Sequence, residues 1–129
     1  MVIVDSSVWI DYFNGVRSRQ ADLLDGRLGR EFVLIGDLIL AEVLQGFDQD
    51  GDFRRARALL GQLDCVEIGG CDLALSSARN YRLLRRRGIT VRKTIDVIIA
   101  TFCIERGHQL LHADRDFDLM REPLGLVTL

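Results

Sequence analysis

Short apolar runs alternate along the chain with longer segments in which apolar residues recur at helical spacing. The five short runs predict strands, and they are VIV (2–4), FVLI (32–35), VEI (66–68), QLL (109–111) and LVTL (126–129). The longer segments predict helices at Val8 to Asn14, Ser18 to Leu24, Leu38 to Gln45, Asp52 to Leu63, Asp72 to Arg87, Ile95 to Arg106 and a short turn around Asp116 to Met120. Strands that alternate with helices of this length need crossover connections. The pattern therefore predicts an α/β fold with a mostly parallel sheet of about five strands and helices on both faces.

Residues at the ends of the predicted elements support these boundaries. Gly88 and Gly107 follow two of the helices and fit the C-cap position, and Thr94 fits the N-cap of the helix that follows it. The only proline, Pro123, lies near the end of the chain, and no Ser/Gly-rich or charged linker interrupts it. We therefore expect residues 1–129 to form a single domain.

Composition narrows the class of protein. The chain has 129 residues, of which 48% are hydrophobic, so it is long enough to bury a sizeable core. It has no apolar run of membrane-spanning length and no signal-peptide pattern, and its three cysteines have no zinc-site spacing, so we expect a cytoplasmic protein with reduced thiols. The formal net charge of -2 means that any binding to nucleic acid must come from a local basic patch.

Two aspartates directly follow predicted strands. Asp5 ends MVIVD, and Asp114 comes shortly after QLL, in the segment LLHADRDFD that also contains Asp116 and Asp118. In parallel sheets, ligands bind in the crevice at the carboxyl ends of the strands, so both side chains would reach one crevice if these strands are neighbours. The alternative for Asp5 is a helix N-cap.

Two further acids lie on predicted helices. Glu42 interrupts the apolar run DLILAEVLQGF, and Asp96 stands at the head of TIDVIIATFCIE, whose apolar residues run nearly all round the helix. Alone, Glu42 could lie on a solvated stripe and Asp96 could interact with the helix dipole. Together with the strand-end aspartates they describe an acidic pocket, and such pockets hold the hard cations Mg²⁺ and Mn²⁺.

The stretches MVIVDSSVWIDYF, LILAEVLQGF and IDVIIATFCIERGHQLLHADRDF, taken in this order, resemble the PIN-domain ribonucleases, most closely the VapC-type toxins of bacterial toxin–antitoxin pairs. The resemblance covers essentially the whole chain. It implies a Rossmann-like three-layer α/β/α sandwich, a Mg²⁺ or Mn²⁺ cofactor and endonucleolytic cleavage of RNA. It also implies a cognate antitoxin protein and a homodimer as partners.

The resemblance assigns roles to individual residues. It implies that Asp5, Glu42, Asp96 and Asp114 are catalytic, and that Asp5, Asp96 and Asp114 bind metal. Asp116 matches a second acid that is often present in the family but is less uniformly a metal ligand, and its alternative role is helix capping. Ser6 and Ser7 match small hydroxyl residues that hydrogen-bond a carboxylate or a bound water, with helix capping as the alternative for Ser7.

Such a site predicts a defined reaction. One or two divalent ions would orient a water for in-line attack on a phosphodiester, and Glu42 would complete the shell or act as the base. The products would carry 5′-phosphate and 3′-hydroxyl ends, because water and not the ribose 2′-hydroxyl is the nucleophile. No histidine is required, so we expect His108 and His112 to be structural or surface residues.

Two other stretches suggest partners. The stretch RNYRLLRRRGITVRK places basic residues before Asp96, and among them Arg86, Arg87 and Arg92 are the expected RNA-binding residues, with Tyr81 available to stack on a base. Trp9, Tyr12 and Phe13 fall on one face of the first helix, and a core role for at least one of them is expected. In the family this region contributes to a groove that receives an antitoxin segment, so these three residues are the expected antitoxin contacts.

Other functional classes remain open. A stand-alone PIN-type RNA-processing nuclease would share the acids. A phosphoacceptor receiver domain needs an acidic pair after the first strand and a late-strand lysine, whereas the only lysine here is Lys93, just before a helix. A phosphatase would need its Asp-x-Asp motif after the first strand, where this chain has Asp5-Ser6-Ser7. An RNA-binding module without catalysis would not need the acids.

Overall fold

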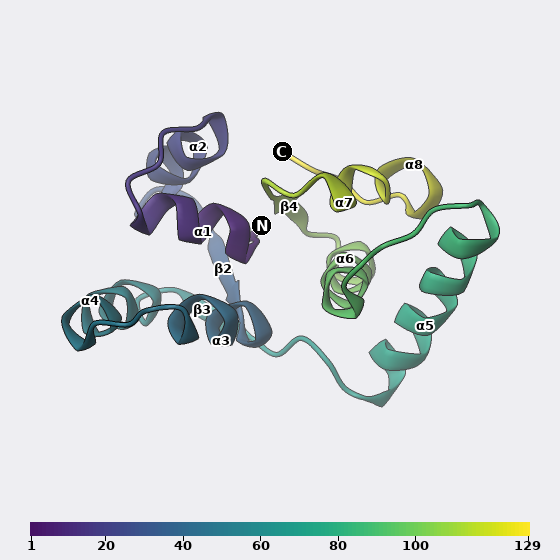
Figure 1. The fold of residues 1–129 in the computed structure, drawn as a ribbon, viewed down its shortest axis with the longest axis horizontal. Coiled ribbons are helices and arrows are strands. Elements are labelled where there is room, and N and C mark those ends of the chain that lie inside the picture. Colours follow the sequence, from purple (N-terminus) through teal and green to yellow (C-terminus); the bar gives the residue numbers. More distant parts are fainter. The chain divides into compact units, whose positions relative to one another are not determined.

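The computed structural model describes all residues, 1–129, and contains four strands and eight helices (Figure 1). Their order along the chain is β1 (Val2–Val4), α1 (Ser6–Phe13), α2 (Arg19–Arg27), β2 (Val33–Gly36), α3 (Asp37–Gln45), α4 (Asp50–Leu60), β3 (Asp64–Val66), α5 (Cys71–Arg86), α6 (Thr94–Arg106), β4 (Gln109–Leu111), α7 (Arg115–Asp118) and α8 (Arg121–Leu124). None of these helices has both the length and the apolar character that a membrane span requires.

The contacts within the chain define two compact units. Unit 1 consists of Met1–Glu67 and Leu111–Ala113, and unit 2 consists of Ile68–Leu110 and Asp114–Leu129. Unit 1 therefore contains β1 to β3 and the first four helices, and unit 2 contains the last four helices. The single domain expected from the sequence remains a prediction.

The strands form one sheet in the order β3-β2-β1-β4. β1 pairs with β2 in parallel, with Ile3 opposite Leu34, and β2 pairs with β3 in parallel, with Ile35 opposite Cys65. On the other side of β1, the Asp5 backbone N–H donates to the Leu111 carbonyl at 2.9 Å. This parallel sheet flanked by helices confirms the α/β fold that the alternating pattern predicted.

The core of unit 1 forms because β1 and β2 are apolar without interruption. Every residue of both strands is buried, as expected for central parallel strands whose two faces are covered. Helix α1 packs against α2 and α3, and α3 packs against α4 and β2. Trp9, Leu24 and Ile39 bring fully buried side chains from three of these helices.

Unit 2 is organised around α6. This helix contacts α5 and α7, and its residues from Asp96 to Cys103 are buried except Ile98, so the expectation of a helix that is apolar nearly all round is confirmed. Cys103 is fully buried, as predicted. Gly107 ends α6 in the left-handed conformation at φ 70°, and Gly88 follows α5 at φ 76°, so both predicted glycine stops are present.

Two of the predicted strands differ from the structure. β3 begins at Asp64, two residues before the predicted run VEI, and ends at Val66. It lies at the edge of the sheet and its first two residues are exposed, so the apolar pattern placed the strand two residues too late. The predicted last strand, LVTL, forms only one parallel bridge, between Thr128 and Leu110 of β4.

Some helix boundaries also differ. Helix α4 begins two residues before the predicted Asp52 and ends at Leu60, three residues before the predicted end. Thr94 is the first residue of α6 and not its N-cap, a position that Lys93 occupies without a side-chain hydrogen bond. Helix α8 was not predicted. Its Pro123 is tolerated because it lies in the first turn, where backbone N–H groups have no helical acceptor.

Candidate active site

Three carboxylates converge in unit 2. Oxygen atoms of Asp96, Asp114 and Asp116 all lie within 4.8 Å of one another. Asp96 is only 4% exposed, and the other two aspartates are half-buried. Carboxylates at this spacing repel one another unless a cation or solvent intervenes. An all-oxygen, all-anionic donor set is the kind that Mg²⁺ and Mn²⁺ prefer, so these residues fit the metal that the sequence predicted.

The positions of the three aspartates follow from helix starts. Asp96 lies in the first turn of α6, and Asp114 is the N-cap of α7, where its Oδ1 accepts the Asp116 backbone N–H at 3.0 Å. Because α6 packs against α7, the two helix N-terminal regions bring their acids together. The N-cap role of Asp114 was not predicted, and it coexists with membership of the cluster.

One cation contacts this cluster. The Arg92 Nε lies 3.7 Å from the Asp116 Oδ2, and the Arg92 side chain is 79% exposed whereas that of Asp116 is 14% exposed. Such an exposed ion pair contributes little to stability. It does place one of the three predicted RNA-binding arginines beside the acids.

Asp5 and Glu42 belong to unit 1. Asp5 is buried and caps α1, since its Oδ2 accepts the Ser7 backbone N–H at 3.1 Å and the Ser7 hydroxyl at 2.6 Å. Glu42 is half-buried on α3, next to the fully buried Val43. The N-cap alternative for Asp5 is thus realised, and the catalytic roles of Asp5 and Glu42 remain predictions.

Ser7 connects two strand ends in unit 1. Besides donating its hydroxyl to Asp5, its Oγ accepts the Ala113 backbone N–H at 3.1 Å. Ser7 thus hydrogen-bonds a carboxylate, which is one of the roles that the sequence suggested for it. Ala113 immediately precedes Asp114 in the chain, and sequence reasoning did not foresee this contact because it joins residues 106 positions apart.

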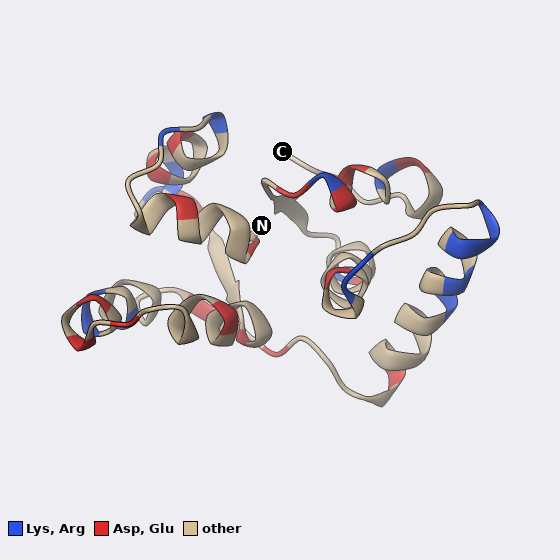
Figure 2. Cartoon of the chain, in the orientation of Figure 1, with Lys and Arg blue, Asp and Glu red and all other residues tan.

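Basic residues gather toward the C-terminal end of α5 and beyond it (Figure 2). Arg86 is exposed, and the Arg87 Nη1 donates to the Glu122 Oε2 on α8 at 3.2 Å. The Arg85 guanidinium lies 5.9 Å from the centroid of the Tyr81 ring, within the range of a cation–π interaction.

Aromatic side chains form a cluster in unit 1, which we call the aromatic cluster: Trp9, Tyr12, Phe13 and Phe47. Trp9 is fully buried and stacks on Phe13 at 5.9 Å between ring centroids, so the expected core role is confirmed. Phe13 meets Phe47 edge-on at 5.7 Å. The Tyr12 hydroxyl donates to Asp25 at 3.2 Å, and partial burial and then the Asp25 charge raise the pKa of Tyr12 above its ordinary value.

Both histidines lie outside the acidic cluster. His112 is buried, and the His108 ring lies 5.8 Å from the Phe102 ring. Partial burial lowers the pKa of His108, so it favours the neutral form. These positions agree with the structural role that we expected for the two residues.

A cavity between α5 and α6 was not foreseen. It has a volume of about 380 Å³ and is lined by residues of both helices, including Tyr81, Arg85 and Val97. The sequence had marked Tyr81 as a residue that could stack on a base, but it gave no sign of the cavity. The packing of two helices cannot be read from either one alone.

Comparisons with known proteins agree with this fold. Residues 2–123 match the family model "PIN domain". The chain is 30% identical to VapC ribonuclease Mb1587 of Mycobacterium bovis over 122 residues, which cover 93% of this chain and 91% of that protein. Two solved structures have the same fold. VapBC2 from Rickettsia felis, solved bound to a promoter DNA fragment, has a TM-score of 0.76 at 13% identity and is matched over 100% of this chain and 98% of the other.

The second structure is a toxin–antitoxin complex from Klebsiella pneumoniae. It has a TM-score of 0.72 at 21% identity, with 99% of this chain and 97% of that chain covered. The family match spans almost all of this chain, including both elements that carry the acidic cluster. The chain therefore belongs to the PIN-domain family.

Proposed function

We propose that this chain is a divalent-metal-dependent endoribonuclease and the toxin of a toxin–antitoxin pair. One observation carries the proposal: carboxylates of Asp96, Asp114 and Asp116 converge within 4.8 Å in a chain whose relatives are VapC ribonucleases. The PIN-domain match and the solved complexes support the same reading. A stand-alone RNA-processing nuclease would share the same acids, and the proposed toxin role is what separates this proposal from that alternative.

The three clustered aspartates would hold Mg²⁺ or Mn²⁺. We propose that Asp5 and Glu42 of unit 1 also take part in catalysis, as the resemblance to the family implies. Ser7 would hold the Asp5 carboxylate in one orientation, because it donates two hydrogen bonds to it.

The residues would divide the work of hydrolysis between them. When bound, a divalent ion lowers the pKa of a coordinated water and offsets the charge that develops on the phosphate. Glu42 would take the proton from the attacking water as a general base. Arg86, Arg87 and Arg92 would bind the phosphates on either side of the cleaved bond, which offsets the repulsion between RNA and the acids.

The chemistry of the product ends tests this proposal. The purified chain should cleave RNA in Mg²⁺ or Mn²⁺, leave 5′-phosphate and 3′-hydroxyl ends, and lose activity in excess EDTA. Asp114→Asn should lower the cleavage rate by at least about 100-fold, because it removes a residue that would bind the metal directly. Even residues that only hydrogen-bond a metal ligand commonly change metal affinity or activity about 10–100-fold when they are replaced. Asp118→Asn is the matched control, since Asp118 is exposed on the same helix and outside the cluster.

Two results would contradict the proposal. Cleavage that leaves 2′,3′-cyclic phosphate ends would mean that the ribose hydroxyl is the nucleophile. Full activity in EDTA, or equal loss in Asp114→Asn and Asp118→Asn, would show that the acidic cluster does not hold a catalytic metal.

We further propose that the aromatic cluster binds the antitoxin and that the chain forms a homodimer. Tyr12 and Phe13 are half-buried and could contribute to an apolar groove for an amphipathic segment. Trp9 is fully buried, so it would support the groove from beneath. Substituting Trp9 would also leave a core cavity, at a cost of about 3–5 kcal/mol.

Phe13→Ala is therefore the better test of antitoxin binding. The protein encoded by the neighbouring upstream gene should co-purify with the wild-type chain and much less with this variant. Phe32→Ala is the control, because Phe32 is 70% exposed in the same unit and outside the aromatic cluster. Equal binding of the antitoxin by both variants would mean that the aromatic cluster is not part of the interface. If the wild-type chain does not bind the protein encoded upstream, an RNA-processing nuclease becomes the better explanation. Light scattering on the purified chain would report its oligomeric state.

A further inference from the structure

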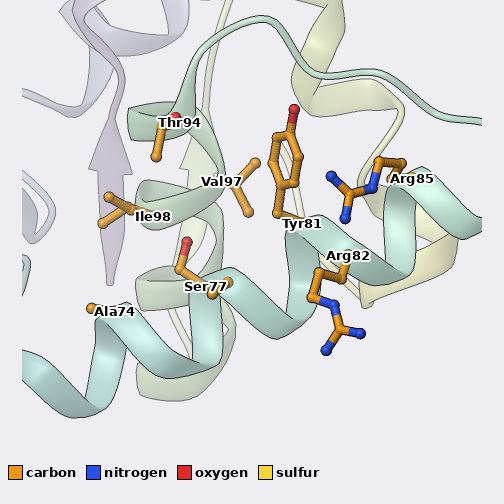
Figure 3. Close-up of a pocket in the computed structure, with 9 residues that line it drawn as sticks. Ala74, Ser77, Tyr81, Arg82, Arg85, Thr94, Val97 and Ile98 are labelled. Carbon is orange, nitrogen blue, oxygen red and sulfur yellow. The ribbon is translucent and has the colours of Figure 1, made fainter.

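The cavity between α5 and α6 combines an apolar wall with cationic and hydroxyl groups. It has a volume of about 380 Å³, within the range of about 300–1,000 Å³ that is common for small-ligand pockets. Helix α5 contributes Ser77, Tyr81, Arg82 and Arg85, and α6 contributes Thr94 and Val97 (Figure 3). All of these residues belong to unit 2.

The side chains are suited to a flat aromatic ligand that carries negative charge. In Figure 3 the Tyr81 ring lies between Val97 and Arg85, and the Arg85 guanidinium is 5.9 Å from the ring centroid. The Ser77 and Thr94 hydroxyls can donate to or accept from polar groups at the edge of such a ring. A nucleobase has an apolar face and a polar edge, and arginine binds its phosphate.

The charge of α5 favours RNA over a protein partner. This helix has one acidic residue, Asp72 in its first turn, and four arginines, which are Arg79, Arg82, Arg85 and Arg86. Two of the four line the cavity. The surface around the cavity is therefore complementary to a polyanion.

The cavity and the acidic cluster use the same helix. Asp96 belongs to the cluster, and its neighbour Val97 lines the cavity, as does Thr94 two residues earlier. Successive residues of an α-helix are about 100° apart, so the cavity-lining Thr94, Val97 and Ile98 lie about 100–200° around α6 from Asp96. The cavity and the acids therefore occupy different faces of the same end of α6, and an RNA chain that passes around this end would place one nucleotide in the cavity and a nearby phosphodiester at the acids.

We propose that this cavity binds one unpaired nucleobase of the RNA substrate and so determines where the chain is cut. The proposal rests on the ribonuclease function proposed above. The exposed Arg85 side chain leaves the face of the Tyr81 ring and binds the neighbouring phosphate together with Arg82. Tyr81 stacks on the base through that face, and the cavity shape selects the base. These residues determine specificity and take no part in bond cleavage.

Filling the cavity tests the proposal. Affinity is measured by fluorescence anisotropy of a labelled single-stranded oligoribonucleotide of mixed sequence, on Asp114→Asn chains in EDTA, so that nothing is cleaved. Ala78→Phe should fill the cavity and Tyr81→Ala should remove the stacking ring, and each should weaken binding roughly tenfold, since stacking on an aromatic side chain commonly contributes that much per base. Tyr81→Phe keeps the ring and should bind like its parent.

Leu75→Phe is the matched control for Ala78→Phe. Leu75 is 59% exposed on the same helix and does not line the cavity, so this variant adds a similar ring elsewhere and should bind RNA normally. In chains with Asp114 intact, sequencing of the RNA ends should show that the cavity variants cut at different positions. Urea midpoints for every variant would identify a folding defect.

The outcomes separate this proposal from the proposed function. Unchanged affinity and unchanged cut sites in Ala78→Phe would overturn the base-binding cavity and leave the nuclease intact. If the wild-type chain cleaves no RNA but binds it in a way that the cavity variants weaken, the base-binding role of the cavity would be supported and the proposed nuclease activity would be overturned. Variants that change only the oligomeric state would show that the cavity binds protein, which also overturns the proposal.

Discussion

Ser7 joins the end of β1 to the chain that follows β4. Its hydroxyl donates to Asp5 at 2.6 Å and its Oγ accepts the Ala113 N–H at 3.1 Å. Asp5 and Ala113 come from distant parts of the sequence, and the residue after Ala113 is Asp114 of the acidic cluster. Loss of the hydroxyl would leave the Ala113 N–H without this acceptor and would leave Asp5 with only the Ser7 backbone N–H as a donor from this residue.

We predict that Ser7→Ala lowers the free energy of unfolding by about 1–3 kcal/mol, since hydrogen bonds each contribute about 1 kcal/mol and more when an acceptor is charged. Urea denaturation would measure this. Ser6→Ala is the control, because Ser6 precedes it on the same helix, and it should have a much smaller effect. Equal effects from the two variants would mean that the Ser7 hydroxyl has no special role.

Tyr12 gives a pH-dependent test. Its pKa is raised above the ordinary value, first by burial and then by the Asp25 charge. The folded state therefore retains the phenol proton to a higher pH than the unfolded state, so stability from this group is present below the unfolded pKa and is lost as pH rises above it. The stability advantage of wild type over Tyr12→Phe should shrink as the pH rises above about 10, the ordinary pKa of tyrosine. An advantage that stays constant or grows over this range would contradict the shift.

At the scale of single residues, the acids were the most predictable feature. Asp96 and Asp114 were predicted to share a site because of their places at the start of a helix and after a strand, and the structure does bring them together. The Arg92–Asp116 ion pair could not be predicted, because it depends on how the loop before α6 folds back. Sequence patterns report the type of residue that a site needs, and long-range contacts come only from the fold.

At the scale of elements, burial decided what could be predicted. β1 and β2 are buried along their whole length and appear as uninterrupted apolar runs, so the sequence located them well. β3 is an exposed edge strand, and its pairing with β2 is backbone hydrogen bonding that apolar patterns do not report. Helix α8 is a single turn containing a proline, so no periodicity could reveal it.

The glycines of two helices allow a matched test. An added Cβ at Gly26 in α2 or at Gly107 after α6 would meet nothing within 4 Å, but only Gly107 has a left-handed backbone, with φ +70°. Gly26→Ala should raise the free energy of unfolding by about 0.5–1 kcal/mol, because it restricts the unfolded chain. Gly107→Ala should lower it by about 1 kcal/mol or more. Thermal and urea unfolding would measure both, and shifts of the same sign would contradict the explanation from backbone conformation.

At the scale of the whole molecule, charge is uneven although the formal net charge is only -2. Basic residues concentrate around the end of α5, and acids converge at the start of α6 and α7 (Figure 2). This arrangement would let a polyanion bind beside a site that itself repels anions. The composition alone could not predict it, because arginines occur throughout the chain.

Replacing Arg86, Arg87 and Arg92 with Ala should weaken RNA binding and reduce its salt dependence, while metal binding remains. Each phosphate that an arginine no longer neutralises should lower the slope of log affinity against log salt by about 0.7, so three such phosphates would lower it by about 2. The control replaces Arg30, Arg54 and Arg57, which are exposed in unit 1 and change the net charge equally. Equal reductions in slope for both variants would mean that net charge, not position, controls binding.

Direct measurement of metal binding tests the central claim, that Asp96, Asp114 and Asp116 hold a divalent ion. Mn²⁺ would be titrated by calorimetry into the wild-type chain, Asp96→Asn and Asp118→Asn, with unfolding curves to confirm that each is folded. We predict saturable binding to the wild type and to Asp118→Asn, and affinity at least about 100-fold weaker in Asp96→Asn. Wild-type affinity in a folded Asp96→Asn chain would contradict the account.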